Sequence, residues 1–545
     1  MIMMYALMKV LAILALTFAD TPPNPSHVVI DGDLYILVMF GLTENGCKDM
    51  RLYPFQYMEA VDLGLEYVYR NHGQLVGVRI GAIFLDDCSS AEHGLQITKD
   101  FYEGVLLVSD STGARIDPDR VVGFVGSETS DRTMKVAEYL KTVKTVLVAP
   151  FATSPQLSDR TRFPYVVRTV PSDSRQGPAF AALFTSLGWP NVHVIIEDDL
   201  SYARDLANAF KAAFEKGEQG RCISSTHMLN SSQKRYNNEQ IISAIINSTS
   251  KTDIVLYVAA VTSIRPLLEA KEKYLGNERG KRLVFIGTEG WGRTESLVKG
   301  HEKAAKGSIS VGLYGEPVKL FDEHMSKLRF GQSSPRSVYT DSYFKSLFNC
   351  DTNCSTDMII TEAPAYSQDT FVMQVLNAVL AIGKATLVRF RQKCKRGAKA
   401  ICKEFGIEFG EEFIKDLDNV CFTGIDGQDF AIRDGESFRA YNFFYWQEDG
   451  TPIKIGASGS EGRSYTPESK HLGFPEDGYY GKLPQSECSK KWCGYFCRRC
   501  RLGRNRNKLN SKCWGCSQAR RERYTKCDAC VPDGEEFKCF NCMEN

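Results

Sequence analysis

Uniformly apolar stretches alternate with segments of helical spacing along most of this chain. Residues 121–126 (VVGFVG) and 145–150 (TVLVAP) are too apolar throughout for half-exposed strands, and residues 131–143 (DRTMKVAEYLKTV) between them have helical spacing. Short apolar runs of this kind are typical of strands that are buried on both faces of a parallel sheet. The pattern therefore predicts a βαβ unit.

The same alternation recurs on both sides of this unit. Residues 31–39 and 76–85 are predicted strands of the same array, and residues 168–173 (RTVPSD) are a predicted crossover into a second array. The second array consists of strands and helices in turn, which are predicted at 191–196, 202–215, 253–260, 264–274 and 282–287. Two such arrays predict an α/β fold with two lobes that face each other across a cleft.

The C-terminal pattern predicts how the chain returns and ends. Residues 308–313 (SISVGL) and a helix at 369–388 are expected to lead back to the first lobe. Residues 432–446 and 451–455 predict a β-ribbon, and a linker rich in Gly, Ser and Pro follows at 456–484.

Two hydroxyl side chains come directly after the strands of the central βαβ unit. Ser130 lies where the turn after the first strand becomes a helix, and Thr153 follows the second strand. Ligands of open α/β sheets bind at the carboxyl ends of the strands, and a helix start offers free N–H groups and a positive dipole end. A carboxylate suits this place. The alternative is that Ser130 is only the N-cap of its helix.

Two carboxylates and an aromatic ring are expected at the facing edge. Asp173 opens the crossover, Tyr202 starts a helix, and Glu289 follows the strand at 282–287. Together they suit an ammonium group, through charge-assisted hydrogen bonds and a cation–π contact. With Ser130 and Thr153 they would bind the head of an α-amino acid. The alternatives are that Asp173 caps a helix, that Tyr202 packs on a helix surface and that Glu289 is a solvated loop acid, while Trp291 is expected to be a packing residue.

Composition excludes some classes of function and favours export. The 545 residues are 43% hydrophobic and 24% charged, with a net charge of +1, which gives no indication of nucleic acid as a partner. Residues 1–19 predict a secretory signal peptide, although a buried N-terminal strand would have a similar pattern. Asn230 and Asn247 begin glycosylation sequons. The eight histidines show no motif that would place one beside Ser130, so we expect no enzyme, and no metal or cofactor is expected.

The 18 cysteines fall into two groups. Eight lie between Cys47 and Cys421, and ten lie between Cys488 and Cys542. Disulfides are expected to stabilise the tail if it is exported, whereas zinc is the alternative for its repeated C-x-x-C pairs. Cys47 and Cys88 are expected to lie in loops beside adjacent strands, so they could pair.

Several segments together resemble one family. VVGFVGSETS, FATSPQLSD, RTVPSD, FIGTEGW and the tail with CWGC and YTKCDAC are similar to motifs of the extracellular ligand-binding region of class C G-protein-coupled receptors, in particular the metabotropic glutamate receptors. The resemblance implies a two-lobed, periplasmic-binding-protein-like (Venus flytrap) domain, followed by a small disulfide-rich β domain. The implied parts are the two-lobed domain at 20–484, with lobe 1 at 30–168 and 310–445 and lobe 2 at 169–309 and 446–484, and the cysteine-rich domain at 485–545.

The resemblance also implies roles for individual residues. Ser130 and Thr153 would hold the α-carboxylate of an amino acid, and Asp173, Tyr202 and Glu289 its α-amino group. In the distal pocket, where glutamate-selective members have an arginine and a lysine, this sequence is expected to place Tyr57 and Glu412. The arginine that follows the GW turn in the family is only roughly matched by Arg293 and Thr294. The expected ligand is therefore an amino acid other than glutamate, with a neutral or cationic side chain, and lobe closure is the expected response.

Pairings and partners follow from the same resemblance. It implies the local disulfides Cys350–Cys354 and Cys394–Cys402, and a bond from Cys222 to the tail. It implies a homodimer through lobe 1, although residues 106–116 lack the cysteine that links many family members covalently. A G protein would be a partner only if a seven-helix domain follows Asn545. The open alternatives are a receptor fragment at the outer face of the plasma membrane, a secreted amino-acid-binding or decoy protein, and the ectodomain of another receptor class.

Overall fold

The computed structural model describes residues 27–468 and short strands of the C-terminal tail. The tail is described only at 524–526, 529–533, 536–540 and 543–544. Within 27–468 the gaps are 74–76, 217–220, 231–236, 251, 314–316, 352, 395–401, 407–408, 438–439 and 460–461. The predicted signal peptide, most of the linker and most of the cysteine-rich domain therefore lie outside the described residues.

The first lobe is built on a six-stranded sheet in the order β1-β5-β2-β6-β7-β8. Its edge strand β1 runs antiparallel to β5, and the other strands are parallel. The strands are β1 (His27–Ile30), β2 (Leu34–Phe40), β5 (Ile80–Asp86), β6 (Val121–Val125), β7 (Leu147–Ala149) and β8 (Val166–Arg168). The predicted central βαβ unit is confirmed as β6, α5 (Ser130–Thr142) and β7.

Helices cover both faces of this sheet because neighbouring residues of a strand point to opposite sides. Ile36 and Val38 of β2 pack in a core with α2 (Tyr53–Val68) and α15 (Val372–Lys393). Leu37 on the other face packs in a core with α4 (Ala91–Tyr102) and α5. Among the described helices, α15 is the one that is long and apolar enough to span a membrane by length and composition, and its apolar window is completely buried in the lobe.

The second lobe contains an eight-stranded sheet in the order β10-β9-β11-β12-β13-β17-β18-β19. The first five strands are parallel and the last three are antiparallel additions. They are β9 (Asn191–Glu197), β10 (Cys222–Leu229), β11 (Ile254–Val258), β12 (Val284–Gly287), β13 (Ile309–Leu313), β17 (Tyr441–Trp446), β18 (Pro452–Ser458) and β19 (Tyr465–Pro467). Helices α6 (Asp173–Ser186) and α7 (Ser201–Glu215) cover one face, and α8 (Asn238–Ile246) and α9 (Ile264–Glu272) cover the other.

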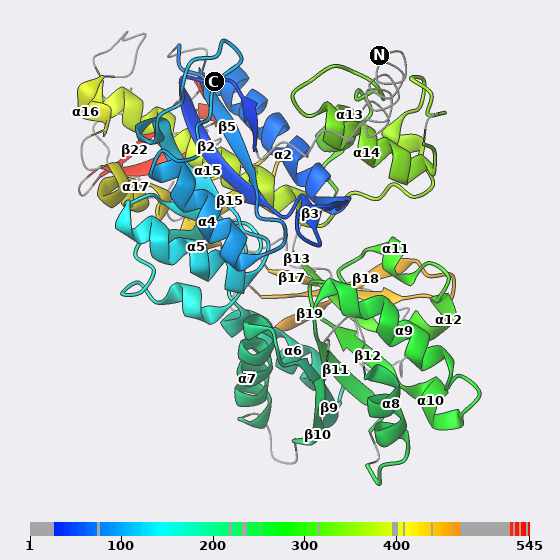
Figure 1. Ribbon diagram of the computed structural model, residues 1–545. Coiled ribbons are helices and arrows are strands. Elements are labelled where there is room, and N and C mark those ends of the chain that lie inside the picture. Colours follow the sequence, from blue (N-terminus) through cyan, green and yellow to red (C-terminus); the bar gives the residue numbers. More distant parts are fainter. Residues whose placement is uncertain are drawn as a thin grey trace, which may run out of the picture.

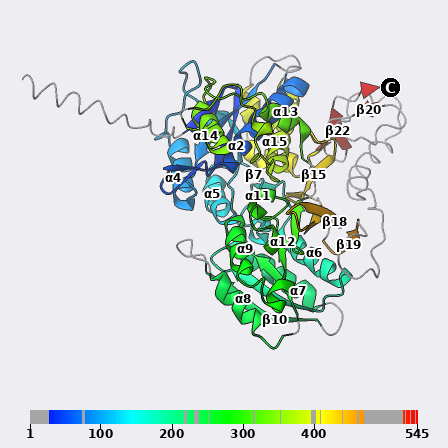
Figure 2. The same ribbon diagram turned by 90° about the vertical axis from the view of Figure 1, so that its right-hand side faces the viewer.

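The expected return to the first lobe at 308–313 is wrong. This segment is β13, which pairs in parallel with β12 and so extends the sheet of the second lobe. The predicted ribbon is confirmed at β17 and β18, but β17 pairs with β13 and also belongs to this sheet. The chain therefore crosses between the lobes after Arg168, after Leu313 and after Ser437. Both views show the two lobes one above the other (Figure 1, Figure 2). Figure 1 shows β13 and β17 near their junction.

Smaller elements complete the lobes. They are β3 (Thr43–Glu44), β4 (Asp49–Met50), α10 (Glu278–Arg282), α11 (Glu295–Val298), α12 (Glu302–Ala305), α13 (Lys319–Met325), α14 (Ser337–Phe348), α16 (Lys403–Gly406), α17 (Phe409–Leu417), β14 (Cys421–Thr423), β15 (Asp429–Arg433) and β16 (Glu436–Ser437). The tail contributes β20 (Tyr524–Lys526), β21 (Ala529–Asp533), β22 (Glu536–Phe540) and β23 (Met543–Glu544). Trp291 is fully buried and stacks on Trp446, which confirms it as a packing residue.

Three disulfides link cysteines of the first lobe. Cys47–Cys88, Cys350–Cys354 and Cys394–Cys402 are all formed, as the sequence predicts. Cys222 is exposed and forms no disulfide with another described residue. Its expected tail partner, like any zinc ligands of the tail, lies outside the described side chains. The sequon residues Asn230 and Asn247 are both exposed in the second lobe.

Candidate ligand-binding site

Ser130 is held at the start of α5 by a turn that needs a glycine. Gly126 after β6 has a φ of +137°, and a Cβ there would lie 2.3 Å from the carbonyl oxygen of Met39. The N-cap of α5 is Thr129, whose hydroxyl accepts from the N–H of Arg132. The capping interpretation of Ser130 is therefore wrong. Its hydroxyl instead accepts from the N–H of Ser154, at 3.1 Å.

Thr153 and Asp173 lie against each other at the junction of the lobes. The N–H of Asp173 donates to the carbonyl of Thr153 at 2.9 Å, and both residues are buried. The cap of α6 is Ser172, so the capping interpretation of Asp173 is also wrong. The Asp173 carboxylate is completely buried, and neither oxygen has a hydrogen bond of good geometry to a described residue. Burial, and then the charge of Glu289, raise the pKa of Asp173 well above its ordinary value.

Glu289 brings a second buried carboxylate to the same place. It follows the carboxyl end of β12 and is 7% exposed, so it is not a solvated loop acid. The amide of Gln176 in α6 donates to it at 2.6 Å. Burial raises the pKa of Glu289, and the Gln176 hydrogen bond lowers it by a smaller amount.

Two tyrosines complete this acidic centre. Tyr202 is half-buried at the start of α7, and its pKa is raised by burial and then by Glu289, Glu197 and Asp173. The pKa of Tyr441 is raised by burial, Asp173 and Glu289. The structure thus brings Ser130, Thr153, Asp173, Tyr202 and Glu289 together. Sequence reasoning missed Tyr441, because YNFFYW indicated only a strand.

The residues around Tyr57, which is expected in the distal pocket, are aromatic and acidic, and we call them the distal wall. Tyr57 in α2 is buried between the rings of Phe40 and Phe151, and its hydroxyl donates to Oδ1 of Asp369 at 2.9 Å. Burial, and then the charges of Asp369 and Glu128, raise the pKa of Tyr57. Burial also raises the pKa of Asp369, whereas Arg293 lowers it.

Two residues of the distal wall belong to motifs that the sequence analysis names. Glu128 is part of the GSETS turn, and Phe151 is the first residue of FATSPQLSD. Glu128 forms an ion pair with Arg51 at 2.6 Å. Asp369 had no signal of its own, since it lies in a loop before a helix.

The expected place of Glu412 in the distal pocket is wrong. Glu412 lies on α17, where its carboxylate pairs with Arg389 at 2.7 Å and Lys393 at 3.0 Å, both on α15. These cations lower its pKa, and no described contact links it to Tyr57. The physical reason is that α17 packs along α15 and uses its charged face to neutralise the buried Arg389.

Hydrogen bonds join the two lobes beside this site. Oδ2 of Asp205 in α7 accepts from the hydroxyl of Ser154 at 2.7 Å and from the amide of Gln156 at 3.1 Å. On another side the hydroxyls of Tyr53 and Ser296 lie 3.0 Å apart. Four of the five predicted site residues are buried at this junction, and Tyr202 is half-buried.

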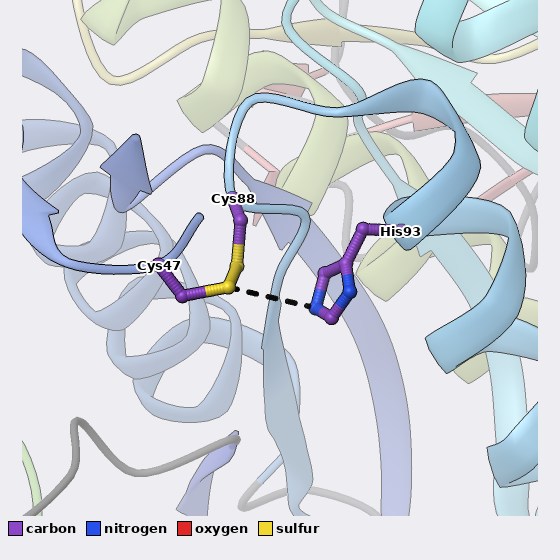
Figure 3. Close-up of side chains that lie close together, drawn as sticks. All are labelled: Cys47, Cys88 and His93. Carbon is purple, nitrogen blue, oxygen red and sulfur yellow. Dashed lines mark hydrogen bonds between the residues drawn. A yellow bond between two sulfur atoms is a disulfide. The ribbon is translucent and has the colours of Figure 1, made fainter. Parts of the chain in front are cut away.

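Among the described residues, two clusters have the composition of a metal site, but their side chains already bind other groups of the chain. His93 lies beside the Cys47–Cys88 disulfide, with its Nε2 4.0 Å from Sγ of Cys47 (Figure 3). The thiols are oxidised, so they are not thiolate ligands. In the second cluster Glu59 pairs with His324 at 2.7 Å and with Arg336 at 3.0 Å. A cation would have to displace that guanidinium.

Two α/β lobes with buried polar residues at their junction are the architecture of a two-lobed ligand-binding domain. The family described as receptor family ligand binding region matches residues 56–448, and the chain belongs to this family. Metabotropic glutamate receptor 4 of Mus musculus is 25% identical over 547 residues, which cover 94% of this chain and 58% of that receptor. The Rattus norvegicus and Macaca fascicularis receptors of the same name have the same identity and coverage.

These comparisons confirm the resemblance that the motifs indicated. The chain is a ligand-binding region like that of class C receptors, in a family of receptors rather than of enzymes. It spans 58% of the length of the curated relatives that it matches.

Proposed function

We propose that this chain binds a free α-amino acid in the interlobe cleft and signals by closing its lobes. The ammonium group would lie between Asp173 and Glu289 against the ring of Tyr202. The carboxylate would accept from the Ser130 hydroxyl, the Thr153 hydroxyl and the start of α5. One observation carries the proposal: the Asp173 carboxylate is completely buried beside another carboxylate and makes no well-formed hydrogen bond to a described residue.

A buried carboxylate destabilises the folded chain unless a cation lies beside it. We therefore expect a cationic group of the ligand at Asp173. An unpaired buried charge destabilises a protein strongly, and a second negative charge beside it adds repulsion. An ammonium group relieves both and forms charge-assisted hydrogen bonds of about 1.5–3 kcal/mol each. Two or three of these match the roughly 5.5 kcal/mol that moves a two-state equilibrium from mostly open to mostly closed.

The distal wall favours a ligand other than glutamate. Tyr57, Phe151 and Phe40 offer apolar rings, and Asp369 carries negative charge, while the charge of Glu128 is offset by Arg51. A distal carboxylate on the ligand would approach like charges, which costs several kcal/mol in a desolvated site. A neutral or cationic side chain fits this wall better.

The cellular context follows from the relatives. We propose that the chain is the extracellular region of a glycosylated, metabotropic glutamate receptor-like protein at the plasma membrane. A G protein is its partner if a seven-helix domain follows. A secreted amino-acid-binding or decoy protein is the alternative. In either setting no nucleic acid, metal or cofactor takes part.

We further propose a homodimer through lobe 1. Val105 and Leu107, just after α4, are 70% and 60% exposed. Exposed large apolar side chains that lie together on one loop favour an interface. Sedimentation of a Val105→Ser/Leu107→Ser variant should show monomers where the unsubstituted chain is dimeric. Val261→Ser, on the second lobe, is the matched control.

Calorimetry with the twenty L-amino acids tests the proposed ligand site. At least one should bind the purified chain, and Asp173→Asn and Ser130→Ala should each weaken that binding by about tenfold or more. Asp198→Ala, an exposed acid at the end of β9, should leave it unchanged. If none of the twenty binds, or if both site variants bind as the unsubstituted chain does, the proposal is refuted.

A further inference from the structure

A buried ion pair lies behind the loop that would hold the ligand carboxylate. Arg168, the last residue of β8, is 1% exposed, and its guanidinium lies 2.5 Å from Oε1 of Glu436. Glu436 begins β16 and is 8% exposed. A buried ion pair adds little stability, because both charges lose their contact with water. The other contacts of this pair indicate a second role.

The guanidinium of Arg168 fixes the loop that follows β7. Its Nη1 donates to the carbonyl oxygen of Ser154 at 2.7 Å, and its Nη2 donates to the Ser158 hydroxyl as well as to Glu436. The Ser158 hydroxyl in turn donates to Oε1 of Glu436 at 2.6 Å. The ion pair is therefore bonded to this loop at two points, Ser154 and Ser158.

Ser154 connects the ion pair to the proposed carboxylate subsite. Its carbonyl accepts from Arg168, while its N–H donates to the Ser130 hydroxyl at 3.1 Å. The residue before it is Thr153, whose carbonyl accepts from the N–H of Asp173 at 2.9 Å. Losing the Arg168 bond would release the Ser154 backbone, and with it the two hydroxyls that the proposed function assigns to the ligand carboxylate.

The ion pair also lies where two crossovers between the lobes meet. The first crossover begins after Arg168, and the third begins directly after β16. The N–H of Arg168 donates to the carbonyl of Gly435 at 2.8 Å, and Nε of Arg175 in α6 lies 3.6 Å from Oε2 of Glu436. Burial is the largest influence and raises the pKa of this carboxylate, but the two arginines and Ser158 together lower it below its ordinary value. Glu436 is therefore ionised and faces a cation on each side of the hinge.

We propose that Arg168 and Glu436 are positioning residues for the ligand carboxylate. They hold the Ser154 backbone so that the hydroxyls of Ser130 and Thr153 face the ligand, and neither is expected to contact the ligand itself. This inference rests on the proposed amino-acid site. Because the pair acts through Ser154, its loss should weaken the binding of the carboxylate end and leave the ammonium end nearly unchanged.

The test must remove both charges together. Arg168 also acts on the ammonium end through its charge, since it lowers the pKa of Asp173. The Arg168→Met/Glu436→Gln variant removes one positive and one negative charge, so the net charge of the hinge stays the same and neither member of the pair is left buried alone.

Two probes that differ only at the carboxylate test this assignment. Calorimetry with the twenty L-amino acids identifies the tightest binder, and its α-amide keeps the ammonium group and the side chain but lacks the negative charge. The ratio of the two dissociation constants, amide over acid, measures the carboxylate subsite. In Arg168→Met/Glu436→Gln this ratio should fall by about fivefold or more, because the acid loses affinity while the amide changes little. Thermal shifts at millimolar ligand extend the measurement to weak binding.

The matched control is another ion pair at the same hinge. Arg160 donates to the carbonyl of Val166 at 2.6 Å and to Asp418 at 2.7 Å, so it too joins a backbone oxygen to a carboxylate. No hydrogen bond between described residues joins it to Ser154. Arg160→Met/Asp418→Asn should therefore leave the ratio unchanged, and an equal fall in this control would refute the proposal.

The other outcomes separate this inference from the proposed function. If acid and amide lose affinity equally in Arg168→Met/Glu436→Gln, or if neither changes, the pair does not position the carboxylate subsite, and the amino-acid site stands. If none of the twenty binds the unsubstituted chain, the proposed function is refuted together with this inference. Thermal unfolding without ligand shows whether each variant is folded. If the pair variant is not, Ser158→Ala removes only the hydroxyl bonded to both charges and should lower the ratio by about twofold or more. An unchanged ratio in that variant refutes the proposal.

Discussion

The carboxylates of Asp173 and Glu289 lie together in one buried space, and the charge of Glu289 raises the pKa of Asp173. The two residues reach this space from different elements, since Asp173 begins α6 and Glu289 follows β12. Gln176 donates a hydrogen bond to Glu289. Without a ligand, the negative charge of Glu289 therefore disfavours the charged form of Asp173. A cation between the two carboxylates would remove this repulsion.

This repulsion predicts the pH dependence of stability. The pKa of Asp173 is higher in the folded chain than in the unfolded chain, so the folded chain binds more protons between the two values. The free energy of unfolding should fall as pH rises from the ordinary aspartate pKa of about 4 toward the raised native value, and stay low above it. Asp173→Asn should reduce this fall, because the contribution of Asp173 is removed while that of Glu289 remains. At pH 7 the unliganded variant should be more stable, by about 1 kcal/mol or more, or roughly 2 °C or more in unfolding temperature.

Thermal melts of the unliganded chain from pH 4 to pH 8 check this. The unsubstituted chain should lose stability relative to Asp173→Asn as pH rises. A bound amino acid should stabilise the unsubstituted chain and not the variant. Parallel curves for the two proteins across this range would contradict a raised pKa at Asp173.

The negative charge of Asp369 in the distal wall predicts how the affinities for glutamate and glutamine compare. These ligands are nearly the same shape and differ in one charge, so their ratio of dissociation constants reports the electrostatics of the wall. Asp369→Asn removes one negative charge beside Tyr57, and should shift this ratio toward glutamate by about fivefold or more. Glu278→Gln, an exposed acid of the second lobe, should not shift it. An unchanged ratio in Asp369→Asn would place the ligand side chain elsewhere.

The sequence predicted most of the fold because the pattern that encodes it is local. The apolar strands at 121–126 and 191–196 and the helix stripes beside them identify themselves within a few residues. The membership of β13 in the second sheet could not be found in this way. A buried strand has the same composition in either lobe, and only its pairing with Ile286 and Gly287 of β12 assigns it.

The site was predictable where residues lie at strand ends and not where folding brings distant segments together. Ser130, Thr153 and Glu289 follow recognisable strands. Asp369 joins Tyr57 across 312 positions, and Tyr441 lies within an ordinary strand. Glu412 was misplaced because spacing within a helix does not show which neighbour the helix packs against.

The position of Glu412 predicts a stability effect without an effect on binding. Glu412→Gln should leave amino-acid affinity unchanged, because the side chain pairs with Arg389 and Lys393 instead of facing the cleft. Arg389 is 2% exposed and also lies 4.0 Å from Asp416. Since the Glu412 side chain is 38% exposed, solvent screens the pair and the cost to unfolding should be about 1 kcal/mol or less. A large loss of amino-acid affinity in Glu412→Gln would show that Glu412 does contribute to the ligand site.

The disulfides predict unequal contributions to stability. Cys47 and Cys88 are 41 positions apart, whereas Cys350 and Cys354 are four apart. In the loop-entropy model, replacing the first pair with serines should cost about 4 kcal/mol and replacing the second about 2 kcal/mol. Denaturant unfolding of the two double variants measures the difference. Equal costs would show that native contacts, rather than loop length, determine these contributions.

The interlobe bond of Asp205 predicts how closure contributes to affinity. Asp205 lies on α7, three residues after Tyr202, and it accepts from Ser154 and Gln156 of the first lobe. Ser154 also donates its N–H to Ser130, so this bond ties the second lobe to the loop that would hold the ligand carboxylate. Asp205→Ala removes the bond from the closed form only, and should weaken amino-acid binding by about five- to tenfold, or roughly 1–1.4 kcal/mol. Small-angle scattering of the liganded variant should show a larger radius of gyration, whereas Asp198→Ala on the preceding loop should match the unsubstituted chain in both measurements. Unchanged affinity in Asp205→Ala would mean that the lobes close without help from this bond, and that the contacts at Asp173 and Glu289 alone hold the cleft shut.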